Sequence, residues 1–479
     1  MRCLIKSQIK FFQQFFIYIL SIVTGISLIS CERDDDNLDW LNSNQKEFCF
    51  NGLKFSYEYG HEECSLIGYE NEEPPSVLEI PSTAYDENSK PYIVKEIGAN
   101  AFYGCKNITE LRIPSSVKEI GDYSFLGCEG IRDITIPEGV EIVGKGAFHE
   151  CKPLSISIPR SLKESKEYAF SVFSSSVEAL NITDLSAWCN IDFKNKDSNP
   201  LYTAEHLVLN GKRITDLEIP EGVKEIKPYA FAKQEMKNFK TITIPKSMRK
   251  IGESAFSMDR VKIDCYLIIK DLNEWLKIDF ENIDSNPMNV AHTIMTNNNI
   301  CNELVIPEGI QELKAYVFCS PNVEVLTLPS SITKMDKNAF HNMALQSINI
   351  ESLSWWLNVE YSGTLLHNGY HYITLYVNDK PLTNTLWIPE GISELRENAF
   401  YGYTKLSAIA LPSTLKYIRK GSLYCTRTAI LSYAKIPPEV ESGYSIQSRG
   451  VTLYVPTGCK EAYESNYSWW DFEEIVDIL

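Results

Sequence analysis

The chain has 479 residues, of which 44% are hydrophobic and 23% are charged, a balance that is ordinary for a globular protein. Its formal net charge is −17, and it becomes −20 once residues 1–31, which hold three basic residues and no acid, are set aside. A chain this acidic, with no basic stripe, argues against nucleic acid as a partner, because phosphates require a basic surface.

Residues 1–31 have the features of a targeting segment. Basic residues open it, and the stretch 11–30 carries no charge. Its end, Leu28-Ile29-Ser30-Cys31, resembles a bacterial lipobox, in which small or aliphatic residues precede a cysteine that becomes lipidated. The resemblance implies lipidation at Cys31, with the membrane reached through this anchor only. A transmembrane anchor and a plain cleaved secretory signal are the alternatives, since the 20 uncharged residues could span a bilayer.

Residues 32–47 follow as an acidic flexible tether that opens with Glu32-Arg33-Asp34-Asp35-Asp36. An acidic run after a lipidated cysteine resembles the export signal by which some Gram-negative lipoproteins reach the outer face of the outer membrane. The resemblance implies a lipid-anchored outer-membrane protein that faces the cell exterior. The alternative is a solvated spacer, which is what most charge runs are. Consecutive aspartates do not provide the spaced ligands of a calcium loop.

Residues 48–97 are predicted to form an N-terminal cap with the first repeat. Short strands are expected at 55–57 and 65–69, as a hairpin that covers the first coil, because terminal repeats need caps. The first repeat begins at Ile80-Pro81. Cys49 and Cys64 are the best candidates for a disulfide, and the sequence leaves open whether they pair.

Residues 98–452 carry a repeat of 23 residues in its clearest copies, which Cys105, Cys128 and Cys151 mark. Within the unit, the stretch 108–113 ends in an alternating pattern typical of a short strand with one buried face. Proline then ends the strand, and a phenylalanine fills the coil. One unit cannot bury its own apolar face, so the fixed period predicts a solenoid of stacked coils with a parallel β ladder on one side. About 15 coils at ~4.8 Å would make it on the order of 70 Å long.

The repeats resemble the leucine-rich repeats of the BspA-like (bacterial surface protein A-like) family, in the pattern LxxIxIPxxVxxIGxxAFxGC over roughly residues 78 to 456. The resemblance implies the fold class: a leucine-rich-repeat right-handed coil with a parallel β ladder on one face. It also implies a surface lipoprotein that adheres to host proteins or to other bacteria.

Three inserts interrupt the repeats, near 180–216, 267–303 and 348–385. Each is predicted to hold a short helix, with Asp184, Asp271 or Ser352 as the N-cap. Hairpin turns are expected at Asn210-Gly211 and Asn378-Asp379. The inserts repeat a tryptophan, for which core packing and ligand stacking are both open: Trp188, Trp275 and Trp356. The third copy lacks the Ser-Asn-Pro that the first two share.

Residues 453–479 are predicted to be the C-terminal cap, with Trp469, Trp470 and Phe472 closing the open end of the core.

The sequence offers no recognisable catalytic or metal-binding constellation. The 13 cysteines are expected to be mostly small buried groups, and the seven histidines do not cluster. There is no Gly-x-Ser-x-Gly elbow, no phosphate-cradling glycine loop and no Cys-x-x-Cys. We therefore expect no enzyme activity, no cofactor and no metal site, although a carboxylate pair cannot be named from sequence.

The outward positions of the predicted strands remain as candidates for ligand binding. Early units are polar there, whereas later ones are apolar at Tyr266, Ile268, Val305, Val325 and Trp387. Exposed apolar residues on a solenoid face are typical of a contact surface. Alternatively, the inserts cover these residues, or the register differs by one and turns them inward.

The sequence thus favours a non-catalytic surface lipoprotein with adhesin-like protein–protein interactions. Its expected partners are a host extracellular or cell-surface protein, or another bacterial surface. The alternative is a glycan-capture lipoprotein that serves polysaccharide use, with Tyr266 and Trp387 as stacking platforms.

Overall fold

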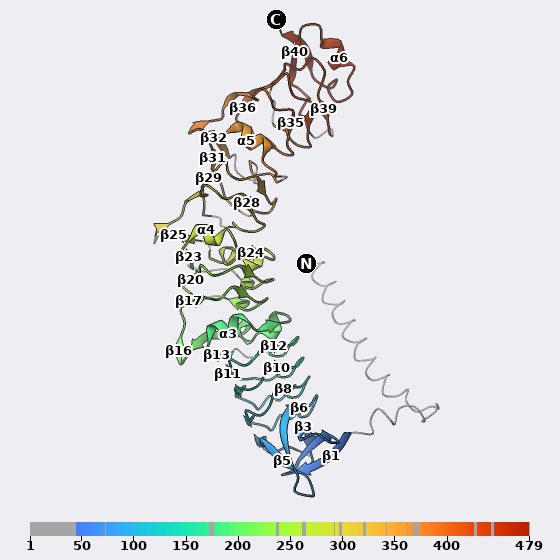
Figure 1. Ribbon diagram of the computed structural model, residues 1–479, viewed down its shortest axis with the longest axis vertical. Coiled ribbons are helices and arrows are strands. Elements are labelled where there is room, and N and C mark those ends of the chain that lie inside the picture. The colour runs from blue at the N-terminus through green and yellow to red at the C-terminus, as the bar shows by residue number, and fades with distance from the viewer. Residues whose placement is uncertain are drawn as a thin grey trace, which may run out of the picture.

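A computed structural model shows the chain as one elongated solenoid, with β1 at one end and β40 at the other (Figure 1). The structure describes residues 45–478 except 72, 172–176, 236–238, 261–264, 292, 297–298, 320–321, 342, 362, 367–372, 426–428 and 442–444. The predicted signal segment with Cys31 and most of the tether lie outside the described residues. Within the described part, no helix is both long and apolar enough to cross a bilayer.

The front of the solenoid is a ladder of parallel strands, one from each coil, which confirms the predicted fold class. Its strands in chain order are β4 (Val77–Glu79), β7 (Glu110–Arg112), β9 (Asp133–Thr135), β11 (Ser155–Ile158), β13 (Val177–Ile182), β15 (Ala204–Leu209), β17 (Asp216–Glu218), β20 (Thr241–Ile244), β23 (Tyr266–Ile269), β25 (Thr293–Thr296), β27 (Glu303–Val305), β29 (Val325–Leu328), β31 (Ser347–Ile350), β32 (Thr374–Val377), β34 (Asn384–Trp387), β36 (Leu406–Leu411), β38 (Ala429–Ser432), β40 (Thr452–Pro456) and β41 (Glu474–Ile478).

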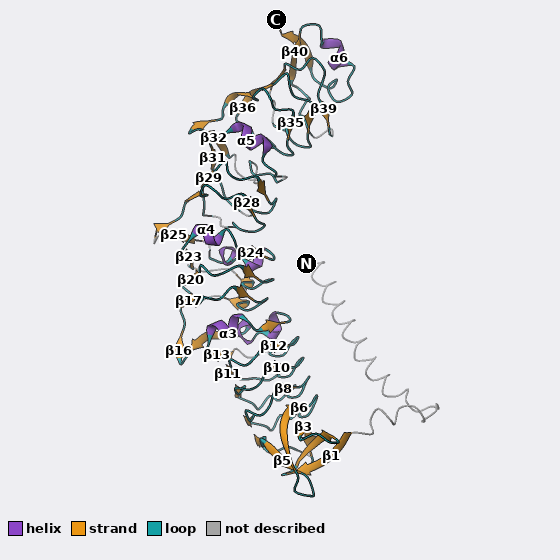
Figure 2. Ribbon diagram, viewed as in Figure 1, coloured by secondary structure: helices purple, strands orange, loops and turns teal. Residues whose placement is uncertain are grey.

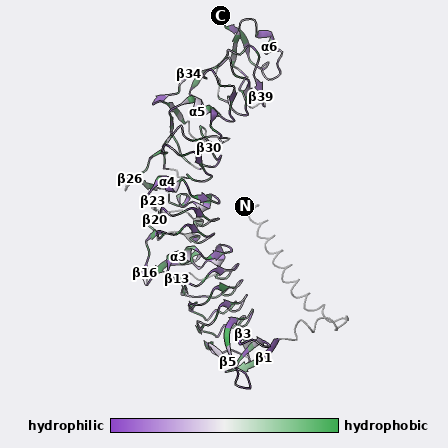
Figure 3. Cartoon of the chain, in the orientation of Figure 1, coloured by the Kyte–Doolittle hydropathy of each residue, from purple (hydrophilic) through white to green (hydrophobic). Residues whose placement is uncertain are grey.

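A second ladder of two-residue strands runs along the back of the coils. Its strands are β8 (Glu119–Ile120), β10 (Ile142–Val143), β12 (Glu164–Ser165), β14 (Asp192–Phe193), β18 (Glu225–Ile226), β21 (Lys250–Ile251), β24 (Asp279–Phe280), β28 (Glu312–Leu313), β30 (Lys334–Met335), β35 (Glu394–Leu395), β37 (Tyr417–Ile418) and β39 (Glu439–Val440). A further pair, β19 (Lys233–Glu235) and β22 (Met258–Arg260), joins two neighbouring coils. Hydrophilic and hydrophobic segments are interspersed along the solenoid, as expected when each coil has its own inner and outer face (Figure 3).

The N-terminal end is closed by antiparallel strands. These are β1 (Gln45–Phe50), β2 (Leu53–Glu58) and β3 (Glu63–Tyr69), and β3 then pairs in parallel with β6 (Pro91–Ile97), which β5 (Thr83–Tyr85) flanks. The disulfide considered for Cys49 and Cys64 does not form, since both are free thiols. Strand β2 lies between their two strands, and Cys49 is exposed whereas Cys64 is buried, so the thiols lie on opposite faces of the sheet.

A column of stacked phenylalanines runs through the N-terminal coils. The ring centroids of Phe102, Phe125, Phe148 and Phe170 follow one another at 5.4, 5.4 and 5.6 Å, with the planes within 11° of parallel. The recurring cysteines pack beside this column, and the thiol of Cys128 donates to the carbonyl of Phe102 in the previous coil. The cysteines are therefore buried packing groups, as expected. Burial raises the pKa of Cys128 to about 12, which keeps it an inert thiol.

Among the described residues, helices lie in the inserts, and one more lies in the C-terminal cap (Figure 2). They are α3 (Leu185–Cys189), α4 (Leu272–Trp275), α5 (Leu353–Asn358) and α6 (Lys460–Glu464), with the 3₁₀ helices η1 (Lys196–Ser198), η2 (Pro200–Tyr202), η3 (Ile283–Ser285) and η4 (Pro287–Asn289). The predicted N-caps are confirmed, because the side chains of Asp184, Asp271 and Ser352 each accept a backbone N–H of their helix.

Hairpins leave the ladder at the end of each insert. Strand β15 pairs antiparallel with β16 (Lys212–Arg213), β25 with β26 (Asn299–Ile300), and β32 with β33 (Lys380–Pro381). The predicted turns are confirmed at Asn210-Gly211 and Asn378-Asp379, all four with positive φ.

The insert tryptophans belong to the core, which resolves the question the sequence left open. Trp188, Trp275 and Trp356 are at most 2% exposed. Their indole N–H groups donate to the backbone carbonyls of Ala230, Val317 and Ala399 at 2.9, 3.1 and 3.1 Å. Each tryptophan thus ties its insert to the following ordinary coil.

The C-terminal cap differs from the prediction at one residue. Trp469 is fully buried, donates to the carbonyl of Pro438 at 2.8 Å and stacks on Phe472 at 5.9 Å. Trp470 is 56% exposed and does not help to close the core. The two tryptophans are adjacent on a turn, so only one of them can point inward.

A buried asparagine joins each of the first two inserts to the next coil. In the second insert, the Asn286 amide donates to the carbonyls of Tyr316 (2.7 Å) and Val317 (3.3 Å) and accepts the N–H of Met288 at 2.8 Å. Because Asn286 is fully buried, its loss would leave the N–H of Met288 and the carbonyl of Tyr316 unpaired away from water, whereas the carbonyl of Val317 would keep the indole N–H of Trp275.

We therefore expect Asn286→Ala to lower the free energy of unfolding by about 2–4 kcal/mol. The matched control is Asn273→Ala, at an exposed position of α4, which should change it by less than about 0.5 kcal/mol. Urea unfolding followed by circular dichroism measures both. Equal effects of the two substitutions would show that the buried amide does not hold the insert in place.

Candidate binding surface

Alternate residues of the front strands face solvent and form two outward columns along the ladder. The predicted register is right, because Leu304 is buried between exposed Glu303 and Val305, and Leu386 is buried before exposed Trp387. Strand pairing places the second outward residue of each strand beside that of its neighbour. These columns are the surface that the ladder offers to a ligand.

The predicted binding residues all lie at outward positions, but they are spread over three separate sheets. Tyr266 and Ile268 are half-buried on β23, in the sheet β17–β20–β23–β25–β26. Val305 (53% exposed) and half-buried Val325 lie on the adjacent strands β27 and β29. Trp387, 60% exposed, begins the last sheet on β34. The structure brings only Val305 and Val325 onto neighbouring strands, and ligand binding by these five residues stays a prediction.

The last sheet, β34–β36–β38–β40–β41, carries an outward column that is apolar from end to end. We call it the C-terminal apolar strip, and its register-matched members are Trp387, Ala410, Leu431, Tyr454 and Val476. Trp387 is exposed, Leu431, Tyr454 and Val476 are half-buried, and Ala410 is covered. Its four strand intervals span about 19 Å at ~4.8 Å each. The parallel outward column beside it holds Thr385, Ala408, Ala429, Thr452 and Glu474. Its single charged member, Glu474, lies at the far edge on β41, so the two columns carry no charge from β34 to β40.

An aromatic pair extends the strip. The rings of Trp387 and Tyr433 lie 6.3 Å apart between centroids, with their planes 25° from parallel. The N–H of Tyr433 donates to the carbonyl of Leu411 at 3.0 Å, which fixes the chain as it leaves β38. Ile436, further along the same loop, is 82% exposed. Large apolar side chains held on a rigid sheet in this way are typical of interaction surfaces.

The sequence interpretation missed Leu431, Tyr433, Tyr454 and Val476. It followed the outward positions only as far as Trp387. The signal was available, because Ala429-Ile430-Leu431-Ser432 and Thr452-Leu453-Tyr454-Val455 continue the alternation of the earlier strands. Tyr433 lies beyond the end of its strand, so the alternation could not have placed it beside Trp387.

Elsewhere the coils are joined by ion pairs between side chains of successive units. Glu129 forms an ion pair with Lys106 of the preceding coil, at 2.6 Å, and a second one with Lys152 of the following coil. The hydrogen bonds and charges of these two lysines lower the pKa of Glu129 to about 2. The acidic side chains of this region are thus partly neutralised by neighbours, in contrast with the uncharged strip at the other end.

The titratable side chains of the described residues serve mainly as buried packing groups or as members of surface ion pairs. Within that part of the chain, no three histidines, cysteines or carboxylates lie close enough together to hold a metal ion. Cys319 is an example of the buried cysteines, since burial raises the pKa of its thiol to about 12.

The family described as BspA type leucine rich repeat region matches residues 95–197, 204–289, 277–357 and 375–446, in six copies. The chain belongs to this family. A search of curated proteins finds no match.

Solved structures of several bacterial repeat proteins are similar to this chain. A leucine-rich repeat protein from Bacteroides ovatus has 20% identity and a TM-score of 0.41 over 90% of this chain and 100% of its own. A leucine rich cell surface protein from Faecalibacterium prausnitzii has 19% identity and a TM-score of 0.36 over 85% and 98%. The pneumococcal vaccine antigen PcpA has 14% identity and a TM-score of 0.33 over 91% and 99%.

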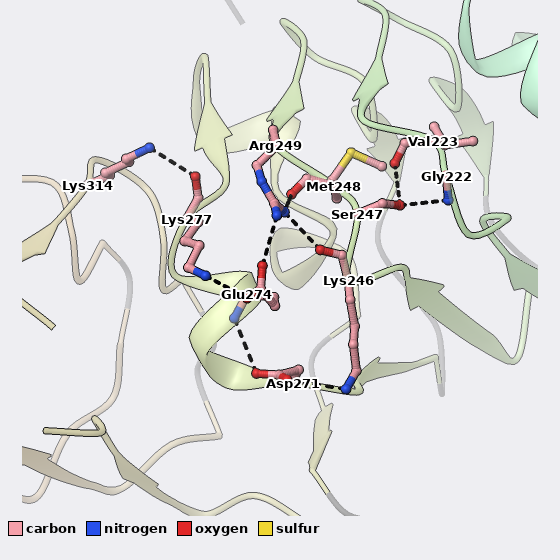
Figure 4. A network of polar contacts seen from close by, with 10 residues as sticks. All are labelled: Gly222, Val223, Lys246, Ser247, Met248, Arg249, Asp271, Glu274, Lys277 and Lys314. Carbon is pink, nitrogen blue, oxygen red and sulfur yellow. Dashed lines mark hydrogen bonds and ion pairs between the residues drawn. The ribbon is translucent and has the colours of Figure 1, made fainter. Parts of the chain in front are cut away.

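In this BspA-type chain, a cationic side chain at one repeat position contacts the second and the third insert. In the second insert, Lys314 donates to the carbonyl of Lys277 at 2.9 Å and pairs with Asp279 at 2.6 Å. Figure 4 shows the same helix held from the preceding coil by Lys246 on Asp271 and by Arg249 on Glu274. The insert helix is therefore fixed to the coils on both sides.

Arg396 takes the place of Lys314 in the third insert, which lacks the Ser-Asn-Pro segment. Its guanidinium lies over the rings of Trp356 (4.4 Å) and Tyr361 (5.5 Å) and donates to their backbone carbonyls at 2.7 and 3.3 Å. Desolvation lowers its pKa to about 10, so it stays charged at neutral pH. Arg396 lies beside a hollow of about 760 Å³, but its contacts there hold the insert in place.

We expect Arg396→Ala to lower the free energy of unfolding by about 2–4 kcal/mol, because it removes a buried stack on two aromatic rings together with two hydrogen bonds. Lys314→Ala at the equivalent, more exposed position should lower it by less than about 1 kcal/mol. Urea unfolding of both variants is the measurement. If Lys314→Ala proved the more damaging, Arg396 would not be the residue that holds the third insert.

Proposed function

We propose that this protein is a non-catalytic binding protein of the bacterial surface. A lipid on Cys31 would anchor it in the outer membrane, with the solenoid facing the cell exterior. Its partner would be a host extracellular or cell-surface protein, or another bacterial surface. The observation that carries the proposal is the C-terminal apolar strip with Trp387 and Tyr433, on a chain of the BspA-type family.

The position of the strip supports this function. Cys31 precedes β1, and β1 lies at the opposite end of the solenoid from β40 (Figure 1). If the anchor lies at the N-terminal end, the strip lies at the end of the solenoid that is furthest along the chain from the membrane. Each buried methylene of an acyl chain contributes ~0.8 kcal/mol to membrane binding. Because a lipidated cysteine carries several such chains, the anchor would be effectively permanent.

The composition of the strip suits a protein partner. Tryptophan and tyrosine are the residues most often responsible for binding energy at the centre of interfaces. Here they stand beside leucine and alanine on a sheet whose backbone is already fixed. Little conformational entropy would be lost when a partner covers it, because the ladder is rigid before binding.

Glycan capture is a second candidate, and one observation favours it. The adjacent rings of Trp387 and Tyr433 provide the kind of aromatic surface on which sugar rings stack. Tyr266 is half-buried and lies in another sheet, so it would not share a short glycan with Trp387.

The test is binding of detergent-solubilised full-length chain to a panel of host matrix proteins, epithelial cells, partner bacteria and polysaccharides. We expect the double substitution Trp387→Ala with Tyr433→Ala to weaken binding at least about tenfold, since hot-spot residues contribute 2 kcal/mol or more. Tyr59→Ala is the control, because Tyr59 is 69% exposed at the other end of the solenoid.

A panel member that binds and is lost with the double variant identifies the partner class, protein or glycan. Failure of every member to bind, or binding that the double variant leaves intact, would contradict the proposed role of the strip.

A further inference from the structure

Each insert ends in a hairpin that closes one sheet of the front ladder. The hairpin of the first insert makes β16 the edge strand of the sheet β16–β15–β13–β11–β9. Two residues separate β16 from β17, which is the edge strand of the next sheet. Among the described residues, β16 pairs with β15 alone and β17 with β20 alone. The edges of β16 and β17 therefore face a common notch on the side of the solenoid where β16 projects (Figure 1).

The backbone of β17 turns hydrogen-bonding groups toward this notch. The carbonyl of Thr215 accepts from Lys240 at 2.6 Å, and the N–H of Ile219 donates to Thr243 at 3.0 Å, so both serve the neighbouring strand β20. Backbone groups alternate in direction along a strand. Those of Asp216 and Glu218 consequently point to the opposite edge, which is the notch.

The notch is a hollow of about 530 Å³, within the size range of ligand pockets. Its apolar lining includes Leu185, Leu209 and Ile219. Its rims have opposite charges: Lys212 and Arg213 on the hairpin side, and Asp216, Glu218 and Glu221 on the β17 side. Glu218 also pairs with Lys270 at 2.7 Å, so Asp216 and Glu221 are the carboxylates that we expect to meet a basic side chain of the peptide.

We propose that this notch binds an extended peptide segment of a partner protein, which adds as a strand along the edge of β17. The peptide places an apolar side chain against the lining and carries an acidic and a basic residue that pair with the two rims. Strand addition supplies main-chain hydrogen bonds for affinity, while pockets and charges for alternate side chains supply specificity. The site is separate from the C-terminal apolar strip and does not depend on the function proposed for it.

The other two hairpins lack this combination. In the third, uncharged Pro381 stands where the first has Arg213, so the basic rim has one charge fewer. In the second, β26 consists of Asn299 and Ile300 and carries no charge. In the third hairpin, Lys380 follows the turn Asn378-Asp379 as Lys212 follows Asn210-Gly211, and both lysines are exposed. Lys380 therefore provides a matched control.

The experiment uses full-length chain and an array of synthetic peptides of about seven residues, in which a central valine is flanked by glutamate on one side and lysine on the other. Each peptide has a scrambled counterpart and a copy with alternate backbone amides methylated. We expect the alternating peptides to bind above their scrambled forms. Methylation, which removes N–H donors, should weaken binding at least about tenfold.

Charge variants locate the site. Lys212→Glu should weaken binding about tenfold and shift the preference to peptides without the acidic residue, whereas Lys380→Glu should leave binding unchanged. Amide hydrogen exchange should slow at residues 216–218 when peptide binds. The proposal is overturned if no peptide exceeds its scrambled form, if methylated copies bind equally well, or if the two lysine variants behave alike.

Discussion

The structure depends on one constraint: no coil of this chain can bury its own apolar residues. A coil of about two dozen residues has an inner face of isoleucine, leucine and phenylalanine, and only the coils above and below can cover it. The column Phe102, Phe125, Phe148 and Phe170, with centroid steps of 5.4 to 5.6 Å, is the clearest expression of this dependence. The caps exist for the same reason. Trp469 and Phe472 cover the last coil, and the β1–β3 sheet lies at the first.

This constraint explains what the sequence could predict. Inward positions must repeat, so the prolines, cysteines and phenylalanines predicted the coil and the ladder correctly. Local chemistry was equally readable, as the N-cap Asp184 and the turn Asn210-Gly211 show. Long-range placement was not readable. Nothing local reveals that Cys49 and Cys64 lie on opposite faces, that Trp470 points outward, or that Tyr433 reaches the ring of Trp387.

The outer face is where copies of the unit are free to differ. Its second outward column is polar over three early strands, at Thr135, Ser157 and Asn181, and apolar in the last sheet. The inserts vary in the same way while keeping a common tryptophan. Two of them lock onto the next coil through a buried asparagine, and the third does so through Arg396. Function in this protein is therefore to be sought in the outward positions and hairpins, since the core residues serve the fold.

The proposed function requires the solenoid to lie outside the cell, where its outer face can meet a partner. The most direct test is protease shaving of intact cells, followed by detection of this chain and of a periplasmic control protein. If the solenoid faces outward, the protease strips the chain from intact cells while the control survives. Survival of the chain until the outer membrane is broken would contradict this orientation and would make the acidic run after Cys31 a spacer only.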